Sequence, residues 1–548
     1  MRRLAIALGR AVVTTRFVPV FAMIAVTLAA APTVFHAMFS GFLVFDDEGY
    51  LLLALREYAH GGVLYDEVFS QYGPAYHQVL AAVFRLAGLD YIHVHGRAFV
   101  LVLWLTVGVT CAVVTHRLTR SVLLASATQI VTLQALVVLR YEPPHPGGLL
   151  ALLVAAILLM GCSWGTEGLR GRLAAGSAGA LLGLAVLTKI NVGALALLAT
   201  GHALLAAAPR SGILRATRIA TTIAFLLIPL ALVPAARHPD VRALLAVALA
   251  AAGGTVLLTP RTQAPPGHLR AALAPLLATF TVVVTVSLGW EVVRGTTLVG
   301  LVEGLVLGPS RHPLRFLDPK PLPSWTVAYA AGWLGLAAAV RAGRLPGPGA
   351  LAALAGPVRI AVGAILLADG WQATQATLAA RSGTLPPRWV GAAAALALTA
   401  GVLVTATVNA RRLAQEYAEG VPLGLPGAES VRVTARQATV YQQLTRSLLT
   451  QCTTFFSQPG LNSFYLFTRR EPPTRMNATM WMDLLDDARQ VRIMERLATL
   501  PGPVCAVVIK LSLSRETPLT RYVEERFVTQ YRMGHFEFRV PREEGVKR

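Results

Sequence analysis

Three consecutive carboxylates, Asp46, Asp47 and Glu48, follow a long apolar run near the start of the chain. A carboxylate can act as a general base toward a hydroxyl group. Ionisable groups are costly to hold beside a bilayer, so a cluster of them is a candidate functional site. Six of the 14 acidic residues in the first 408 positions fall within residues 46–67. One aspartate is also placed to cap a helix that would stop at Gly61. Because a cap needs one acid and not three, we interpret the cluster as a candidate catalytic site.

The composition places this cluster on an integral membrane protein. The chain has 548 residues, of which 55% are hydrophobic and only 14% are charged, whereas soluble domains carry about 25% charged residues. The net charge of +21 fits an excess of Lys and Arg in cytoplasmic loops. We find no basic patch interleaved with aromatics, so a nucleic-acid partner is not expected.

Apolar segments long enough to cross a bilayer recur through the first three quarters of the chain. We predict an all-α polytopic protein with 11–13 transmembrane helices, the first of them uncleaved. The predicted spans are at about 17–39, 98–115, 121–139, 147–163, 173–188, 191–208, 219–235, 242–258, 271–290, 325–340, 349–368 and 389–408. Basic loops share the side of the N-terminus, which the positive-inside rule assigns to the cytoplasm. Residues 46–97 then face the exterior.

The elements that must hold the acids lie in this first external loop, residues 46–97. The first is a predicted helix whose one apolar face carries Leu51, Leu52, Leu55 and Tyr58, which suits a helix in the plane of the interface. A turn at Gly73-Pro74 leads into a second apolar helix. Such a scaffold would hold carboxylates rigidly at the boundary between water and lipid.

From about residue 413 the chain becomes polar. Residues 452–457 and 504–510 have the pattern of short buried strands, and residues 481–500 that of an amphipathic helix between them. We therefore predict a small C-terminal α/β domain, residues 413–548, after a membrane domain, residues 1–412.

The sequence does not decide on which side of the membrane the tail lies or whether its two cysteines are paired. Segment 349–368 carries Arg359 near its middle, which is costly in a bilayer. If the segment crosses the membrane, the tail is cytoplasmic; if it does not, the number of crossings is odd and the tail is external. The basic sequence at 409–412 favours a cytoplasmic tail. Cys452 and Cys505 could pair in an oxidising compartment, but we favour two buried thiols.

The stretch DDEGYLLLALREYAHGGVLYDEVFSQYGPAYHQVLAAVFRLAG, residues 46–88, resembles the first external loop of the GT-C superfamily of polytopic glycosyltransferases. It is most similar to bacterial relatives of the protein O-mannosyltransferases and of the lipid A aminoarabinose transferase, in glycosyltransferase families 39 and 83. LTKINVG (187–193), RYEPPHPGG (140–148) and the tail stretch 459–477 also resemble segments of that family. The resemblance favours an external tail.

The resemblance implies an activity and a base. Such proteins move a sugar from a polyprenyl-phosphate carrier to an acceptor outside the cytoplasm, with inversion of the anomeric centre. Asp47 matches the base best, and Asp46 is the alternative. Glu48 would bind the acceptor or hold the base in place. An inverting transferase needs no second carboxylate as nucleophile.

A leaving phosphate needs a cation. Lys189 is the only lysine before residue 320 and falls at a predicted external helix end, where it would bind phosphate or simply end the helix. The remaining expected substrate contacts have structural alternatives as helix anchors, turn residues or packing residues. They are Tyr72, Arg97, Arg140, Glu142 and His145. A basic cluster at Arg311, His312 and Arg315 could close over the donor, or be a solvated charge run.

We expect no required cofactor. A divalent cation bridging carboxylate and phosphate is conceivable, with His93 and His95 on one side of an extended segment, but their spacing is not diagnostic. Expected partners are the lipid-linked donor, a lipid, glycan or protein acceptor, and the lipids of a bacterial cytoplasmic membrane. The competing hypothesis is a transporter or a flippase of cell-envelope precursors, which would place ionisable residues near the midplane of its spans.

Overall fold

The chain was analysed as a computed structural model, in which the described residues are 2–43, 47–163, 168–207, 212–227, 268–308, 388–509 and 516–542, with a few more between 242 and 253. The predicted spans at 325–340 and 349–368, most of the span at 242–258, and the basic cluster at 311–315 lie outside these residues.

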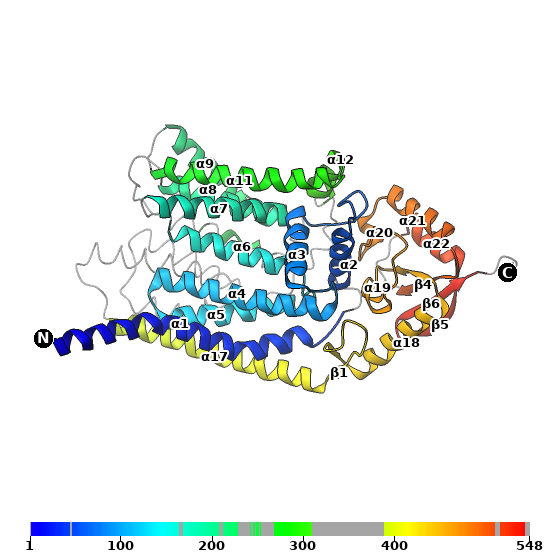
Figure 1. Cartoon of the computed structure of the whole chain (residues 1–548), viewed down its shortest axis with the longest axis horizontal. Helices are drawn as coiled ribbons and strands as arrows, with labels where there is room; N and C mark the ends of the chain where they lie inside the picture. Colours follow the sequence, from blue (N-terminus) through cyan, green and yellow to red (C-terminus); the bar gives the residue numbers. More distant parts are fainter. Residues whose placement is uncertain are drawn as a thin grey trace.

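Long apolar helices form a bundle along the longest axis of the molecule (Figure 1). They are α1 (Arg2–Phe39), α4 (His93–Thr119), α5 (Val122–Leu136), α6 (Pro146–Gly161), α7 (Leu169–Thr188), α8 (Ile190–Ala207), α9 (Gly212–Leu227), α11 (His268–Val293) and α17 (Arg388–Glu419). Among the described residues, Phe17–Phe39, His93–Thr119, Leu169–Thr188 and Ala271–Val293 are long and apolar enough to cross a membrane. The protein is a multi-pass membrane protein, as predicted.

Among the described helices, α7 and α11 pack together most extensively, and a small residue brings them together. A side-chain carbon added to Gly179 would lie only 2.0 Å from the carbonyl oxygen of Leu276. One turn earlier, Thr279 Oγ1 donates to the carbonyl of Gly176 at 2.6 Å. Small residues and hydroxyl groups are the usual means of close helix packing in a membrane. This contact fixes α7, which ends next to Lys189.

The two predicted interface helices are confirmed as α2 (Asp47–Ala59) and α3 (Pro74–Ala87), which lie across the ends of the bundle helices (Figure 1). Pro74 opens α3, where its missing N–H has no cost. Gly88 ends α3 with φ +64°, a left-handed conformation that glycine adopts without strain. The predicted apolar face of α2 is buried, and so are all of residues 50–55, which lie on every side of the helix.

The C-terminal part is a small α/β domain built on a four-stranded sheet. Its elements are β1 (Val421–Pro422), β2 (Arg432–Val433), α18 (Ala435–Gln451), β3 (Thr454–Gln458), α19 (Ser463–Thr468), α20 (Trp481–Leu484), α21 (Asp487–Thr499), β4 (Val504–Ile509), α22 (Pro518–Arg526), β5 (Phe527–Met533) and β6 (Phe536–Pro541). The strand order is β3-β4-β6-β5, with β3 and β4 parallel. The two predicted strands are confirmed. The predicted helix at 481–500 is interrupted, because Asp486 caps a new helix by accepting a hydrogen bond from the Arg489 N–H.

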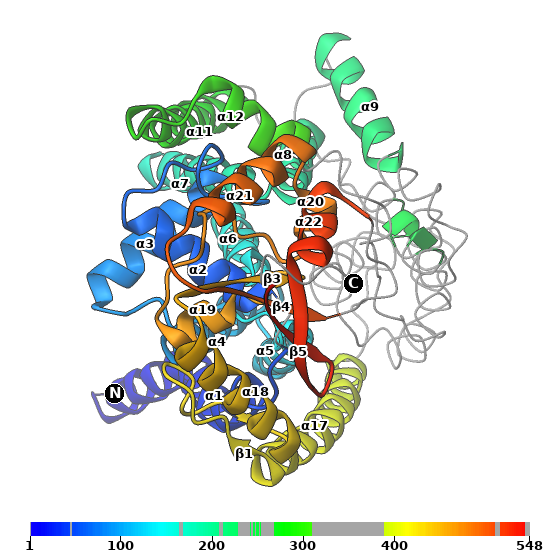
Figure 2. The ribbon, with the colours of Figure 1, turned by 90° about the vertical axis from the view of Figure 1, so that its right-hand side faces the viewer.

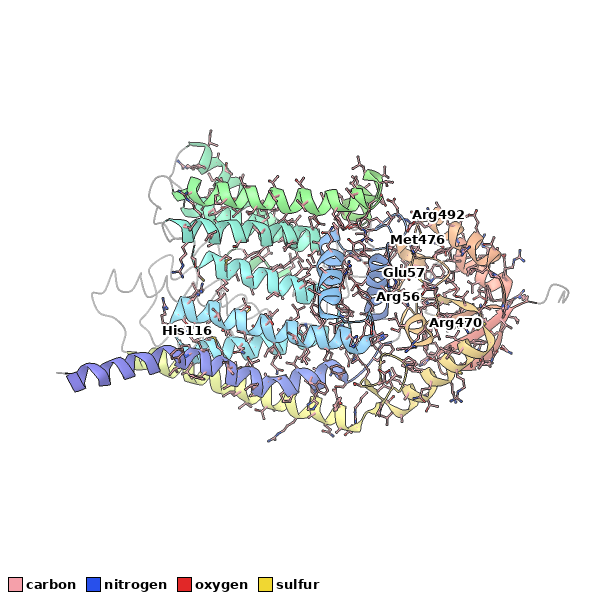
Figure 3. All side chains as sticks on the ribbon, viewed as in Figure 1. Arg56, Glu57, His116, Arg470, Met476 and Arg492 are labelled. Atoms are coloured by element: carbon pink, nitrogen blue, oxygen red, sulfur yellow. A yellow bond between two sulfur atoms is a disulfide. The ribbon has the colours of Figure 1, made fainter. Side chains whose placement is uncertain are left out.

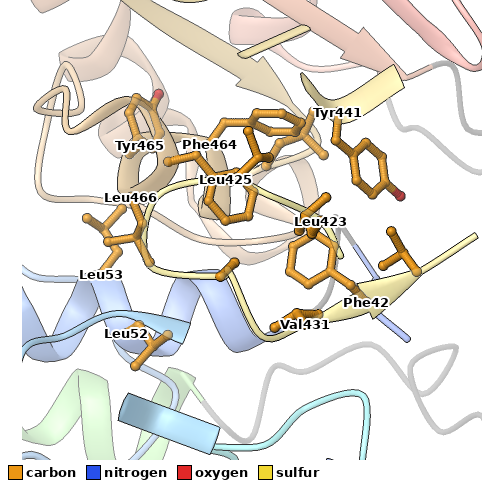
Figure 4. Packing of buried hydrophobic residues seen from close by; sticks show 14 of the residues in the cluster. Phe42, Leu52, Leu53, Leu423, Leu425, Val431, Tyr441, Phe464, Tyr465 and Leu466 are labelled. Atoms are coloured by element: carbon orange, nitrogen blue, oxygen red, sulfur yellow. The ribbon is translucent and has the colours of Figure 1, made fainter. Parts of the chain in front are cut away.

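This domain packs against α2 and covers the end of the bundle (Figures 1 and 2). One hydrophobic cluster joins the two parts and includes Leu52 and Leu53 of α2 with Leu423 and Phe464 of the domain (Figure 4). The tail therefore lies on the same face as residues 46–97. The basic sequence at 409–412 pointed to the opposite face. That indication is wrong because α17 continues through it to Glu419, and the boundary predicted after residue 412 falls inside this helix.

A disulfide bond joins Cys452 and Cys505, whose Cα atoms are 5.7 Å apart. It links the residue after α18 to the second residue of β4. The expectation of two free thiols is therefore wrong. Cys111 in α4 and Cys162 directly after α6 form no disulfide and are half-buried.

Candidate active site

The candidate base lies where α2 begins. Asp47 is the first residue of α2, whereas Asp46 lies outside the described residues. The assignment of the base to Asp47 or Asp46 therefore stays a prediction. What the structure adds is the set of contacts that fix the start of this helix.

The first of these contacts is an ion pair between Glu48 and Arg97. Both side chains are fully buried. Arg97 Nε and Nη2 donate to the two carboxylate oxygens of Glu48 at 2.8 and 2.6 Å. Arg97 Nη1 also donates to the carbonyls of Met38 and Gly41 at 2.5 and 3.2 Å. The pair thus ties the start of α2 to α4 and to the end of α1.

This burial corrects two predicted roles. Glu48 and Arg97 were expected among the substrate contacts, but neither has exposed surface with which to contact a substrate. A bidentate arginine–carboxylate pair is geometrically specific. We assign the pair to holding the helix on which Asp47 stands, which is the second of the two roles considered for Glu48.

Replacing Arg97 by Met is expected to destabilise the protein rather than to weaken substrate binding. Removing one partner strands a buried charge and costs about 3–5 kcal/mol. Thermal unfolding in detergent would measure this loss. A variant that keeps its stability and shows only a raised donor KM would restore Arg97 as a substrate contact.

Three predicted residues from three separate segments meet at the same end of the bundle. Lys189 follows the last residue of α7, and its Nζ lies 5.4 Å from the centroid of the Tyr72 ring. The Tyr72 and His145 rings meet edge to face at 5.6 Å. Tyr72 is only 4% exposed, which favours its predicted packing role over stacking on a sugar.

The Gly73-Pro74 turn brings these segments together. A side-chain carbon on Gly73 would lie 1.9 Å from the Leu187 carbonyl oxygen, so only glycine fits here. The Gly73 N–H donates to the carbonyl of Thr188 at 3.0 Å. From α3, the Tyr76 hydroxyl donates to the carbonyl of Pro144 at 2.7 Å. The turn therefore fixes both the end of α7 and the loop before α6.

His145 is neutral in this arrangement. Its Nδ1 accepts a hydrogen bond from the Gly147 N–H at 3.0 Å and caps α6. Burial, and then the charge of Lys189, lower the pKa of His145 from 6.5 to about 3. At neutral pH the Lys189 ammonium is therefore the cation of the Tyr72–His145–Lys189 group, as recognition of a phosphate requires.

The two other predicted residues of segment 140–148 have different positions. Arg140 pairs with Glu416 of α17 at 2.6 Å and lies over the ring of Tyr141 at 4.5 Å. This is the anchoring role that was its alternative. Glu142 belongs to the turn before α6, where its carbonyl accepts from the His145 N–H at 2.9 Å. It therefore neighbours the Tyr72–His145–Lys189 group through the backbone.

His93 and His95 do not form a pair. They lie in the first turn of α4 and not in an extended segment. His93 Nε2 is 3.0 Å from Ser463 Oγ, whereas His95 Nδ1 accepts from the Asp90 N–H at 2.9 Å. Within the described ranges, no group of three or more His, Cys, Asp or Glu side chains is placed to hold a metal ion.

Sequence reasoning missed a buried carboxylate at the end of α11. Glu291 is 0% exposed and accepts hydrogen bonds from the Tyr58 hydroxyl and from Gln78 Nε2, both at 2.7 Å. Arg294 lies over the Tyr58 ring at 4.0 Å and donates to the Tyr58 carbonyl. These contacts hold the end of α2 that is remote from Asp47. An acid directly after an apolar span was the available signal.

No protein-family model matches the chain, and no curated protein sequence does. In structure, the chain is similar to the oligosaccharyltransferase AglB of Archaeoglobus fulgidus in complex with an inhibitory peptide and a dolichol-phosphate. The TM-score is 0.40 and the identity 12%, over 94% of this chain and 74% of that chain. The chain is also similar to ArnT from Cupriavidus metallidurans in the apo state, with a TM-score of 0.40 and 16% identity over 97% of this chain and 98% of that chain.

Proposed function

We propose that the protein is a membrane glycosyltransferase that moves a hexosyl or pentosyl group from a polyprenyl-phosphate carrier to an acceptor hydroxyl. The observation that supports this most is the Tyr72–His145–Lys189 group. Three segments that are far apart in the sequence bring a cation to the end of the bundle across which α2 lies, and α2 begins with the candidate base. A phosphate leaving group and an acceptor hydroxyl need this combination of charges.

In the proposed reaction, the acceptor oxygen attacks the anomeric carbon as the bond from that carbon to the phosphate oxygen breaks. The hydroxyl proton passes to the carboxylate of Asp47, or of Asp46 if the motif is shifted by one residue. The leaving polyprenyl phosphate takes the bonding electrons, and the Lys189 ammonium stabilises the charge that develops on it. A single displacement inverts the anomeric centre.

We place the site on the external side of a bacterial cytoplasmic membrane. The disulfide between Cys452 and Cys505 supports this side, because disulfides persist in oxidising compartments. The basic loops on the side of the N-terminus support it independently. The acceptor would be a lipid, a glycan or a protein at that face, and we propose that no cofactor is required.

The function is tested with purified protein in liposomes that contain a polyprenyl phosphate carrying a radiolabelled sugar, with a cell-envelope lipid and glycan extract as acceptor source. The expected result is loss of label from the carrier and a product of inverted configuration, also after EDTA treatment. A flippase or transporter would instead move the intact donor between leaflets without cleaving it. Movement without cleavage would contradict the proposal.

A further inference from the structure

A charged seam joins the first external loop to the C-terminal domain. We use the name charged seam for Arg56, Glu57 and Glu67 of the loop with Glu471 and Arg475 of the domain. Arg475 Nε lies 3.2 Å from Glu57 Oε2, and its Nη1 lies 2.9 Å from Glu67 Oε2. Arg56 Nη2 lies 3.2 Å from Glu57 and 3.1 Å from Glu471. Figure 3 shows Arg56 and Glu57 at the boundary between α2 and the domain.

Glu57 distinguishes this seam from ordinary surface ion pairs. Exposed pairs contribute little to stability because water screens them. The Glu57 side chain, however, is only 7% exposed and has an arginine from each of the two parts within 3.2 Å. A nearly buried carboxylate depends strongly on its partners. Arg475 therefore neutralises a charge that sits on α2 itself.

The domain also contacts the other end of α2. A side-chain carbon on Gly49 would lie 2.3 Å from the backbone nitrogen of Ser463, so α19 lies directly against the first turn of the helix. Glu57 and Asp47 belong to one unbroken helix, about 15 Å apart along its axis. A displacement of either end of α2 would therefore also displace Asp47, the candidate base.

We propose that Arg475 is a positioning residue for sugar transfer, which acts by holding α2 against the C-terminal domain. The inference rests on the proposed function and extends it, because the domain then completes the active site instead of only covering it. Arg475 itself does not contact the substrate. Its effect is on the placement of Asp47, and small displacements of a reacting group are costly in rate.

The test compares Arg475→Gln with Arg470→Gln in the full-length protein. Arg470 lies in the same segment but donates to carbonyls of its own domain, those of Thr453 and Leu449. We expect Arg475→Gln to lower kcat by about tenfold or more with the donor KM unchanged, because the Tyr72–His145–Lys189 group is untouched. Arg475→Lys, which keeps the charge, should recover part of the loss. Arg470→Gln should behave as the wild type.

Hydrogen exchange of the α2 amides gives a second readout that does not need activity. Arg475→Gln should speed exchange over residues 47–59, and Arg470→Gln should not. Unchanged kcat, or a lower kcat with unchanged α2 exchange, would overturn the positioning role. If the wild type transfers no sugar, the proposed function fails, and unchanged exchange in Arg475→Gln would then show separately that Arg475 does not hold α2.

Discussion

Asp47→Asn is expected to reduce sugar transfer by about 10²- to 10⁴-fold, the usual contribution of a positioned general base. Asparagine keeps the size of the side chain, so α2 should begin as before. The amide cannot accept the proton of the acceptor hydroxyl. The loss should therefore fall on kcat, while the affinity for the lipid-linked donor is retained. Single-turnover transfer from a radiolabelled donor, with donor binding measured separately, would check this.

Asp46→Asn is the matched control, because it removes a charge one residue away. If Asp46→Asn is inactive and Asp47→Asn active, the base is Asp46. Full activity of both variants and of the double variant would exclude a base in this pair. The pH profile adds a further criterion: the wild-type rate should fall in acid as the base is protonated, and Asp47→Asn should lose that limb. The pKa of His145 is lowered to about 3, close to the ordinary range of an aspartate, so the loss of this limb in Asp47→Asn, and not the limb by itself, assigns the base.

The local structure of the first loop could be predicted because its signals are short in range. The Gly73-Pro74 turn and the apolar face of α2 follow from a few neighbouring residues, and both are found in the structure. The strands β3 and β4 were visible for the same reason, since β4 is a short apolar run and β3 is a short run around Phe455 and Phe456. The resemblance to a known family then supplied roles that local patterns do not contain.

The partners of charged residues could not be predicted, because they depend on contacts over long sequence distances. Glu48 and Arg97 look like two accessible charges in the sequence, yet they neutralise each other in the interior. Arg140 meets Glu416, and Arg475 meets Glu57, across most of the chain. Lys189 differs from these arginines, because the residues it meets, Tyr72 and His145, were themselves among the expected substrate contacts.

The positive-inside rule also misplaces a boundary where a helix continues past the membrane surface. The arginines at 411 and 412 marked a cytoplasmic boundary by the positive-inside rule. In the structure, Arg412 lies 3.9 Å from Glu416 on the same helix, and α17 ends only at Glu419. The two arginines therefore lie about two turns before the end of α17, and the side of the tail follows from its packing on α2.

Lys189→Met is expected to lower kcat/KM for the lipid-linked donor by about 10²- to 10³-fold, the effect of removing one group that stabilises a developing anion. Methionine preserves most of the length and apolar surface of the side chain, so the end of α7 should stay in place. Because Lys189 is the second cause of the depressed His145 pKa, that pKa should rise in the variant. It should stay below 6.5, since burial is the larger cause.

Two variants separate a phosphate role from a general effect of charge. Lys189→Arg keeps a cation at the same position and should retain much of the activity. Arg412→Met removes an exposed cation elsewhere, with its side chain 62% exposed, and should leave donor kinetics unchanged. The decisive measurement is the affinity for polyprenyl phosphate without sugar, because this product shares only the phosphate and the lipid with the donor. If Lys189→Met binds polyprenyl phosphate as the wild type does, the role of Lys189 is only to end helix α7. If affinity falls together with kcat/KM, the ammonium acts on the phosphate in both the bound state and the transition state.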